Sequence, residues 1–151
     1  VLHTPSYREK YLDFLEYDFP RIPLPKNQGV FLGLVGVGRQ LLRLHTLEGV
    51  PEPNVRFEGK KDDPVKQVRF EELPLHGEGK VWINTSLCFE GVPRAAWEWQ
   101  VGGYRPLQKY LKDRMGRILS SEEIELYRKM VMVAVETLRL EEELEALKWL
   151  V

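Results

Sequence analysis

Residues 120–151 carry a long helical pattern that any fold of this chain must accommodate. The pattern begins at a capping box, with Ser120 followed three residues later by Glu123. Apolar side chains then recur at helical spacing on two stripes. The stripes are Ile124, Tyr127, Val131, Ala134 and Leu138, and Leu126, Met130, Val133 and Leu140. Beyond Glu141 only Leu144, Leu147 and Val151 continue the pattern. We therefore expect a helix that is buried in its first half, followed by a partly exposed acidic helical arm, 141–151, that docks to a partner.

Two earlier segments also have helical spacing. Residues 6–19 predict a short amphipathic helix behind a capping Ser6. Three prolines in residues 19–25 fix the backbone and remove N–H donors, so residues 1–26 are expected to form a helix plus a Pro-rich connector. Residues 28–47 predict a largely buried helix. Its glycines are expected to let another backbone approach closely, and they are Gly29, Gly33, Gly36 and Gly38.

The middle of the chain has a strand pattern. Residues 51–66 are rich in Pro, Gly, Lys and Asp and are expected to form a loop. Strand-like runs follow at 65–71, 80–84, 86–89 and 95–101, the last because Trp97, Trp99 and Val101 alternate with polar residues. Turns are expected at 77–79 and 91–93, and a helix at 105–114. These elements predict an α+β fold, in which a small antiparallel sheet of three to four strands packs with helices.

Length and composition favour one domain of ordinary size. The chain has 151 residues, of which 43% are hydrophobic, so it can bury a core. No apolar run reaches the roughly 18 residues that a membrane-spanning helix needs, so no membrane partner is expected. A single cysteine excludes an internal disulfide, and a cytoplasmic location is expected. Because the sequence opens with Val in mid-pattern, we expect residues 1–151 to be a single domain from the C-terminal part of a larger enzyme.

No motif in the sequence predicts a catalytic residue, a metal site or a cofactor site. The glycine run at 33–38 is followed by Arg39 and Gln40, not by the Lys and Ser/Thr of a phosphate-binding loop. The three histidines have no metal-ligand spacing. Asn84 opens a glycosylation sequon but is better explained as the cap of a turn. Cys88 lies in an apolar run with no base assigned to it, and is expected to be a buried side chain. A small enzyme with its own pocket is therefore the weakest hypothesis.

The net charge of −1 conceals a strongly basic segment. Residues 93–117 contain six Lys and Arg against two acidic residues, a net charge of +4, whereas residues 118–151 have a net charge of −4. Basic side chains interleaved with aromatic ones suit a nucleic acid, because Arg can hold phosphates or the guanine edge and Lys neutralises phosphate. The alternative is a solvated helix face above an aromatic core.

Three groups of motifs together resemble a known family. They are Tyr7-Arg8 followed by Asp18-Phe19-Pro20-Arg21-Ile22-Pro23, then Leu41-Leu42-Arg43-Leu44-His45, then Gly102-Gly103-Tyr104 with Leu111-Lys112-Asp113-Arg114 and Leu119-Ser120. In this order they resemble the C-terminal specificity domain of type ISP restriction-modification enzymes. Those enzymes combine nuclease, helicase-like ATPase, adenine-N6 DNA methyltransferase and target-recognition parts in one polypeptide. Related domains also follow methyltransferases that lack the other parts.

The resemblance implies a target-recognition domain that positions double-stranded DNA for a catalytic domain outside this chain. The partner would be the methyltransferase domain of the parent polypeptide, which would bind S-adenosylmethionine, with ATP and Mg²⁺ as further candidates for the parent. This sequence contains no Asn-Pro-Pro-Tyr motif. We therefore expect that it does not methylate DNA alone and holds no cofactor.

We place the expected DNA contacts on the basic segment and on one polar loop. The candidates are Gly102, Gly103, Tyr104, Arg105, Lys109, Lys112, Arg114 and Arg117, with Lys60 and Lys61 on the loop. The rival hypothesis is an interdomain docking module without direct DNA readout. In that case Arg114 and Arg117 would pair with Glu122, Glu123 or Glu125 within the fold.

Overall fold

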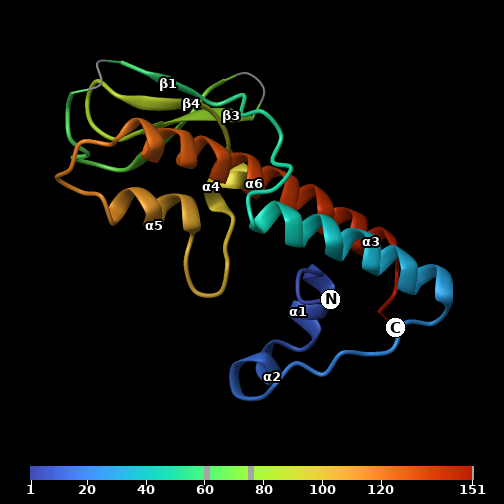
Figure 1. Ribbon diagram of the computed structural model, residues 1–151. Helices are drawn as coiled ribbons and strands as arrows, with labels where there is room; N and C mark the ends of the chain where they lie inside the picture. Colours follow the sequence, from blue (N-terminus) through green and yellow to red (C-terminus); the bar gives the residue numbers. More distant parts are fainter. Residues whose placement is uncertain (60–61, 75–76, 151) are drawn as a thin grey trace. The chain divides into compact units, whose positions relative to one another are not determined.

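The computed structural model describes residues 1–59, 62–74 and 77–150, in two compact units. The sheet unit is Val50–Val135, and the helical unit is Val1–Gly49 together with the segment from Glu136 onward. Helix α6 (Ser121–Ala146) is continuous and contributes to both units (Figure 1). Within the described ranges no helix has the length and apolar character to cross a membrane. The predicted α+β class is confirmed.

The sheet unit is built on a four-stranded antiparallel sheet with the strand order β1-β4-β3-β2. Its elements are β1 (Arg56–Glu58), β2 (Arg69–Glu72), β3 (Glu78–Trp82), β4 (Cys88–Pro93), α4 (Arg94–Glu98) and α5 (Pro106–Lys112). Strands β3 and β4 form the centre of the sheet, where Val81 lies opposite Phe89. A bulge between Gly79 and Lys80 shifts the register at the start of β3.

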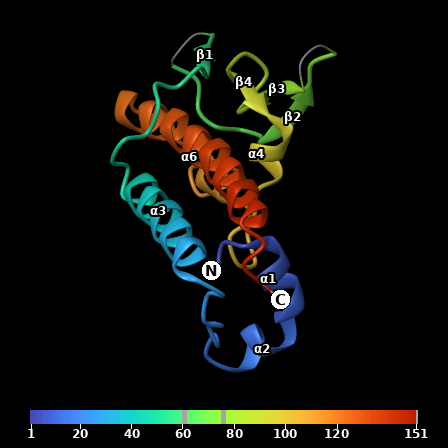
Figure 2. The same cartoon turned by 90° about the vertical axis from the view of Figure 1, so that its right-hand side faces the viewer.

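Helices cover one face of this sheet. Figures 1 and 2 show α4 and the first part of α6 beneath the strands. Phe89 of β4 and Tyr127 of α6 are fully buried, with ring centroids 4.3 Å apart. Trp97 of α4 and Leu107 and Leu111 of α5 complete the same core. Each large apolar side chain that is buried stabilises the fold by roughly 2 kcal/mol. Burial of Leu107 and Leu111 therefore fixes which side of α5 is left exposed.

The structure corrects the strand predictions at two places. Residues 95–101 do not form a strand, because the one-turn helix α4 buries Ala96 and Trp97 together and stacks Trp97 on Phe70, 5.8 Å away. The expected loop at 51–66 contains β1, an edge strand of three residues whose exposed ends give little alternation signal. The other three runs overlap β2, β3 and β4, and the expected turn at 91–93 lies inside β4.

The helical unit packs α1 (Pro5–Lys10) and α3 (Gln28–His45) with the last part of α6. Helix α3 runs antiparallel to α6 (Figure 2), since Gly33 lies against the Leu147 side chain while the His45 Nε2 lies 2.9 Å from the Thr137 hydroxyl. The close approach expected of the α3 glycines therefore occurs at Gly33, whereas Gly36 and Gly38 face open space.

One helix prediction needs correction in this unit, and the second half of α6 can be described more closely. The helix expected at 6–19 is broken at Tyr11 into α1 and the short helix α2 (Leu12–Tyr17). The acidic second half of α6 exposes Glu142 and Glu143, while its other side packs within the chain, where Leu144 is 1% exposed and the carboxylate of buried Glu141 pairs with Arg8 at 3.1 Å. The N-terminal segment that covers this half lies too far away in the sequence for periodicity to reveal it.

Gly79 is a position where a side chain should be poorly tolerated. A Cβ built there would lie 2.4 Å from the Phe70 ring and 2.6 Å from the Glu71 carbonyl oxygen. We expect Gly79→Ala to lower the free energy of unfolding by roughly 1–3 kcal/mol through overpacking. Gly36→Ala, on an open helix face, should instead raise it by about 0.5–1 kcal/mol. Chemical denaturation of both variants checks this, and equal effects of the two substitutions would contradict it.

Candidate nucleic-acid interface

The connection from α4 to α5 carries an exposed tight turn. Val101 and Tyr104 form a bridge in which each backbone N–H donates to the other carbonyl, at 3.0 and 3.4 Å. Gly102 takes a positive φ of 59°, a conformation that favours glycine. Neither Gly102 nor Gly103 has an atom within 4 Å of where a Cβ would lie. The turn therefore fixes the backbone at the exposed Tyr104 and leaves room for a ligand to approach it.

Helix α5 follows this turn and presents a basic face. Pro106 begins the helix, a favourable position because it has no N–H to leave unpaired. Exposed Arg105, Lys109 and Lys112 recur at a spacing of three or four residues, opposite the buried Leu107 and Leu111. They border an open depression of about 430 Å³, whose lining includes Gln100, Tyr104, Arg105, Gln108, Lys109 and Lys112.

The cations of this face differ in how far they are neutralised. Lys109 pairs with Asp113 one turn along the helix, at 2.8 Å. Among the described residues, Arg105 and Lys112 form no ion pair, so their charge is available to an anion. Gln100 and Gln108 were missed by the sequence analysis, although Gln108 lies three residues after Arg105, on the same helical face. Their amides add neutral donors and acceptors to the depression.

Arg114 and Arg117 pair with a shared carboxylate, although the Arg117 side chain remains 59% exposed. The Glu123 Oε1 accepts from Arg114 Nε at 2.9 Å and also from Arg117. Arg114 additionally donates to the Tyr110 carbonyl at 2.9 Å and lies 3.5 Å from the centroid of the Tyr110 ring. This pairing is the arrangement that the docking hypothesis expects for these two arginines.

Glu123 also forms the capping box predicted at the start of α6. Its Oε2 accepts the Ser120 N–H at 3.0 Å, while the Glu123 N–H donates to the Ser120 hydroxyl at 3.1 Å. The hydrogen bond from the Ser120 backbone, together with Arg114 and Arg117, holds the pKa of Glu123 below its usual value. One carboxylate therefore joins the end of the basic segment to the first turn of α6.

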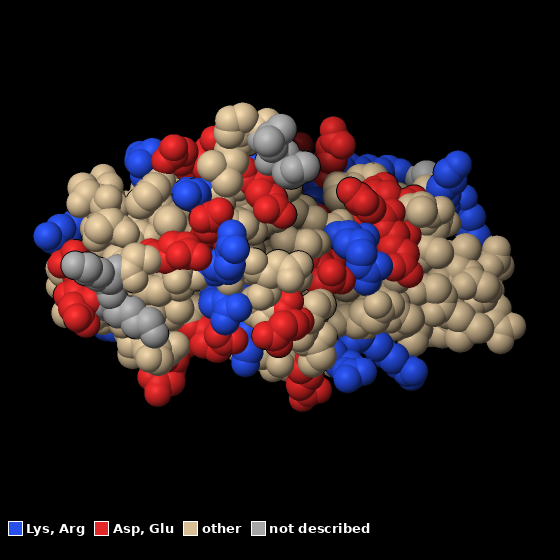
Figure 3. All heavy atoms as spheres, turned by 90° about the horizontal axis from the view of Figure 1, so that it is seen from above, with Lys and Arg blue, Asp and Glu red and all other residues tan. Residues whose placement is uncertain are grey.

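The outer face of the sheet carries many charges that compensate one another. Figure 3 shows Lys and Arg interspersed with Asp and Glu over the molecule seen from above, the side on which this face lies. Glu90 pairs with Arg56 at 3.3 Å and with Lys80 at 3.3 Å, and Arg69 pairs with Glu71 at 3.5 Å. These pairs leave little net positive potential to attract a polyanion. Lys60 and Lys61, the second candidates, lie outside the described residues.

Cys88 and the acidic residues do not assemble a recognisable reaction centre. Cys88 is buried, and removal from water raises the pKa of its thiol, which keeps it in the less reactive neutral form. In the part of the chain that the structure describes, no three His, Cys, Asp or Glu side chains gather where they could hold a metal ion. The basic turn and helix are the stronger candidate for a functional site.

The fold and this surface define a small α+β binding module whose exposed turn and helix carry unpaired basic side chains. A family model described as the Type ISP C-terminal specificity domain matches residues 1–146. The chain therefore belongs to this family, and the resemblance seen in the sequence is confirmed. No match is found among curated proteins.

Solved structures with the same fold come from much longer chains. A nuclease-deletion mutant of the Type ISP restriction-modification enzyme LlaGI, in complex with a DNA substrate mimic, is 25% identical, with a TM-score of 0.68 over 94% of this chain. The DrdV–DNA complex is also 25% identical, with a TM-score of 0.72 over 95%. The ATP-dependent Type ISP enzyme LlaBIII bound to DNA shares the fold at 21% identity, with a TM-score of 0.67 over 94%. This chain spans 13%, 17% and 10% of those three chains, respectively.

The Glu123 network predicts a pH-dependent contribution to stability. Because the pKa of Glu123 is lowered in the folded state, its stabilisation is present above about pH 4.5 and is lost as the pH falls through the lower folded value. We expect Glu123→Gln to lower the free energy of unfolding by on the order of 1 kcal/mol at neutral pH and by much less at acid pH. Denaturation of the variant and wild type across pH 3–7 measures this difference.

Glu122→Gln is the matched control, because exposed Glu122 has no ion pair among the described side chains. It should show a small effect from the helix dipole alone. Identical pH profiles for the two variants would contradict the assigned role of Glu123.

Proposed function

We propose that this specificity domain recognises a DNA sequence in double-stranded DNA, through the turn at 101–104 and the exposed face of α5. The observation that carries the proposal is the pair of uncompensated cations, Arg105 and Lys112, beside an exposed aromatic ring and an open depression. Membership of the family supports it, as do the two 25% identical structures described as DNA complexes.

Each group on this surface has a distinct use in such a complex. The Arg105 guanidinium can donate two hydrogen bonds to the guanine edge or to a phosphate, while Lys112 can neutralise a phosphate. Gln108 can read adenine in the major groove with its amide. Lys109, already shared with Asp113, is a weaker contributor. Arg114 and Arg117 mainly stabilise the fold through Glu123, so their contribution to DNA binding is secondary.

The chemistry on the bound DNA belongs to another domain in this proposal. The chain itself is proposed to be non-catalytic and to position DNA for a methyltransferase domain of a longer polypeptide, which would use S-adenosylmethionine. ATP and Mg²⁺ would serve further domains of the same parent enzyme, and the setting would be the cytoplasm. Family membership and the much greater length of the similar chains support this arrangement.

A second candidate function is docking to other domains, and a specific observation favours it. Much of the exposed apolar surface lies in the helical unit, including Tyr17, Phe19, Ile22, Leu24, Phe31, Leu32 and Leu42. Exposed clusters of this kind mark interaction sites in soluble proteins. Docking and DNA recognition can coexist, because the proposed DNA contacts all lie in the sheet unit.

Salt-dependent binding of a duplex distinguishes the two functions. We expect Arg105→Ala/Lys112→Ala to weaken binding of a random-sequence duplex by roughly tenfold or more and to reduce the slope of log affinity against log salt by about 1–2. The reason is the loss of two cations that contact phosphates or bases.

Lys66→Ala/Lys129→Ala provides a matched control with the same change in charge. Both lysines are exposed residues of the sheet unit with no ion pair among the described residues. If the two double variants bound alike, the surface would be excluded as the interface. A wild-type chain that retained no duplex at low salt would favour the docking function.

A further inference from the structure

Helix α3 is apolar on two opposite faces. Three buried side chains form its inner face: Val37, Leu41 and Leu44. At 3.6 residues per turn, its outer face also carries large apolar side chains, namely Phe31, Leu32, half-buried Val35 and Leu42. Phe31 is 51% exposed, Leu32 57% and Leu42 66%. A surface helix ordinarily opposes its apolar stripe with a polar face. A continuous exposed apolar strip marks an interaction surface instead.

Two features of this outer face restrict what can cover it. Gly36 lies on the face, and no atom lies within 4 Å of where its Cβ would be, so another backbone can approach closely there. Arg39 and Arg43, one turn apart, are exposed and form no ion pair within the described ranges. The occupant should therefore combine apolar side chains with acidic ones.

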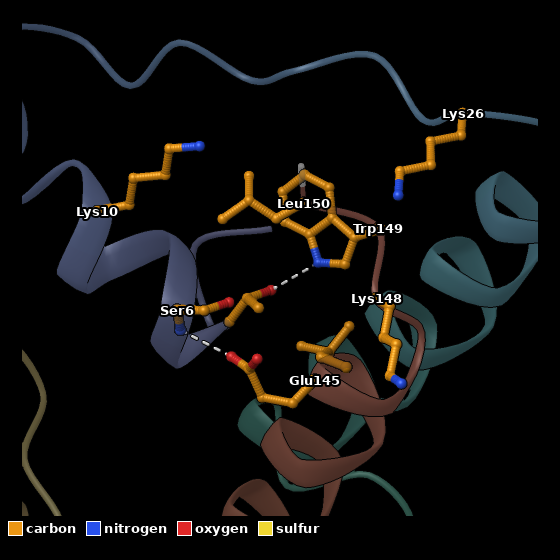
Figure 4. Close-up of a pocket in the computed structure, with 9 residues that line it drawn as sticks. Ser6, Lys10, Lys26, Glu145, Lys148, Trp149 and Leu150 are labelled. Atoms are coloured by element: carbon orange, nitrogen blue, oxygen red, sulfur yellow. Dashed lines mark hydrogen bonds between the residues drawn. The ribbon is translucent and has the colours of Figure 1, made fainter.

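The N-terminal segment of this chain is engaged elsewhere in the helical unit. The Ser6 N–H donates to the Glu145 carboxylate at 2.7 Å (Figure 4). The Trp149 Nε1 donates to the Thr4 hydroxyl at 3.3 Å, and the Trp149 ring stacks on buried Tyr7 with centroids 6.0 Å apart. These contacts hold the segment against the end of α6, so it does not cover the outer face of α3.

A second copy of this chain is disfavoured as the occupant by charge. A symmetric pairing of two outer faces about Gly36 would bring both copies of Arg39 and Arg43 into one interface. Like charges that meet across an interface act against the pairing. The charge of this face favours a different, acidic partner.

We propose that the outer face of α3 docks an acidic amphipathic helix from another part of the parent polypeptide. The apolar strip extends about 16 Å along the helix axis, from Phe31 to Leu42, which matches three turns of a second helix. The apolar side chains of the partner pack on this strip, its carboxylates pair with Arg39 and Arg43, and the two helices cross at Gly36.

The proposal deepens the docking function by naming the chemistry of the partner. It rests on the proposed longer parent polypeptide, which is supported by similar chains of which this chain spans 13% and 17%. It does not depend on the DNA surface, because α3 lies in the helical unit and the proposed DNA contacts lie in the sheet unit.

Binding of designed helical peptides tests the proposal. The probe is a fluorescein-labelled peptide of about 21 residues, with leucines along one stripe and glutamates on both sides of it. In the control peptide lysines replace the glutamates, and circular dichroism verifies that both peptides are helical. Wild type should bind the acidic peptide roughly tenfold or more tightly than the lysine peptide.

Arg39→Glu/Arg43→Glu should reverse the order of the two peptides, because it inverts the charge of the face. Lys66→Glu/Lys129→Glu makes the same change of charge at exposed positions of the sheet unit, and it should retain the wild-type order. All four positions are exposed, so both variants should fold, as circular dichroism would show.

Gly36→Leu tests the close approach of the two helices. It adds apolar surface but fills the space above the helix, so it should weaken binding of the acidic peptide by about tenfold. Tighter binding would show that the face holds apolar peptides without a fitted helix crossing, which would contradict the proposal.

Three results would overturn the proposal. The first is that wild type binds neither peptide, and the second is that it binds both equally. The third is that wild type sediments as a dimer which Gly36→Leu dissociates, because the occupant would then be a second copy of this chain.

Duplex binding by the same variants separates this proposal from DNA recognition. If wild type binds the acidic peptide but no duplex, DNA recognition by this chain is wrong and the docking face stands. If wild type binds duplex but neither peptide, the docking face is wrong and DNA recognition stands. If Arg39→Glu/Arg43→Glu also reduces the salt slope of duplex binding while the control variant does not, the face contacts DNA and the acidic helix is excluded as its occupant.

Discussion

Burial of the apolar side chains of α6 is the constraint on which the rest of the structure depends. Its first part supplies Tyr127, Val131 and Ala134 to the core beneath the sheet, and its last part supplies Leu140 and Leu144 to the helical unit. The residue at which α6 begins therefore determines which of its side chains face each core. The capping box of Ser120 and Glu123 sets that beginning, and the same glutamate anchors Arg114 and Arg117. The Glu123 side chain therefore connects the first turn of α6 to the basic segment.

Ion pairs such as those of Glu123 determine which basic side chains remain unpaired at the surface. The fold neutralises most of the basic side chains of residues 93–117: Arg114 and Arg117 through Glu123, Lys109 through Asp113, and Arg94 through Glu72 and Glu98. The positive charge that remains available to a ligand is therefore confined to a small surface. Arg105 and Lys112 flank a depression beside Tyr104, on a helix held in place by Leu107 and Leu111. Position and pairing, more than net charge, determine the candidate interface.

Local patterns predicted the elements that depend on neighbours in the sequence. The capping box, the helix of residues 28–45 and the basic face of α5 follow from spacings of three and four residues. Alternation misled at Trp97, because one turn of helix buries that side chain as well as a strand would. The burial of Leu144 and the stacking of Tyr7 on Trp149 depend on tertiary packing between distant segments. The hydrophobic periodicity of a single segment does not reveal such long-range contacts.

The central claim is that this chain reads DNA sequence by itself. The most direct test is to bind the chain to a pool of random-sequence duplexes at two salt concentrations and to sequence the DNA that is retained. The account predicts retention that weakens at the higher salt concentration, together with enrichment of a defined motif. Retained DNA with no enriched motif, or no retention at either salt concentration, would contradict it.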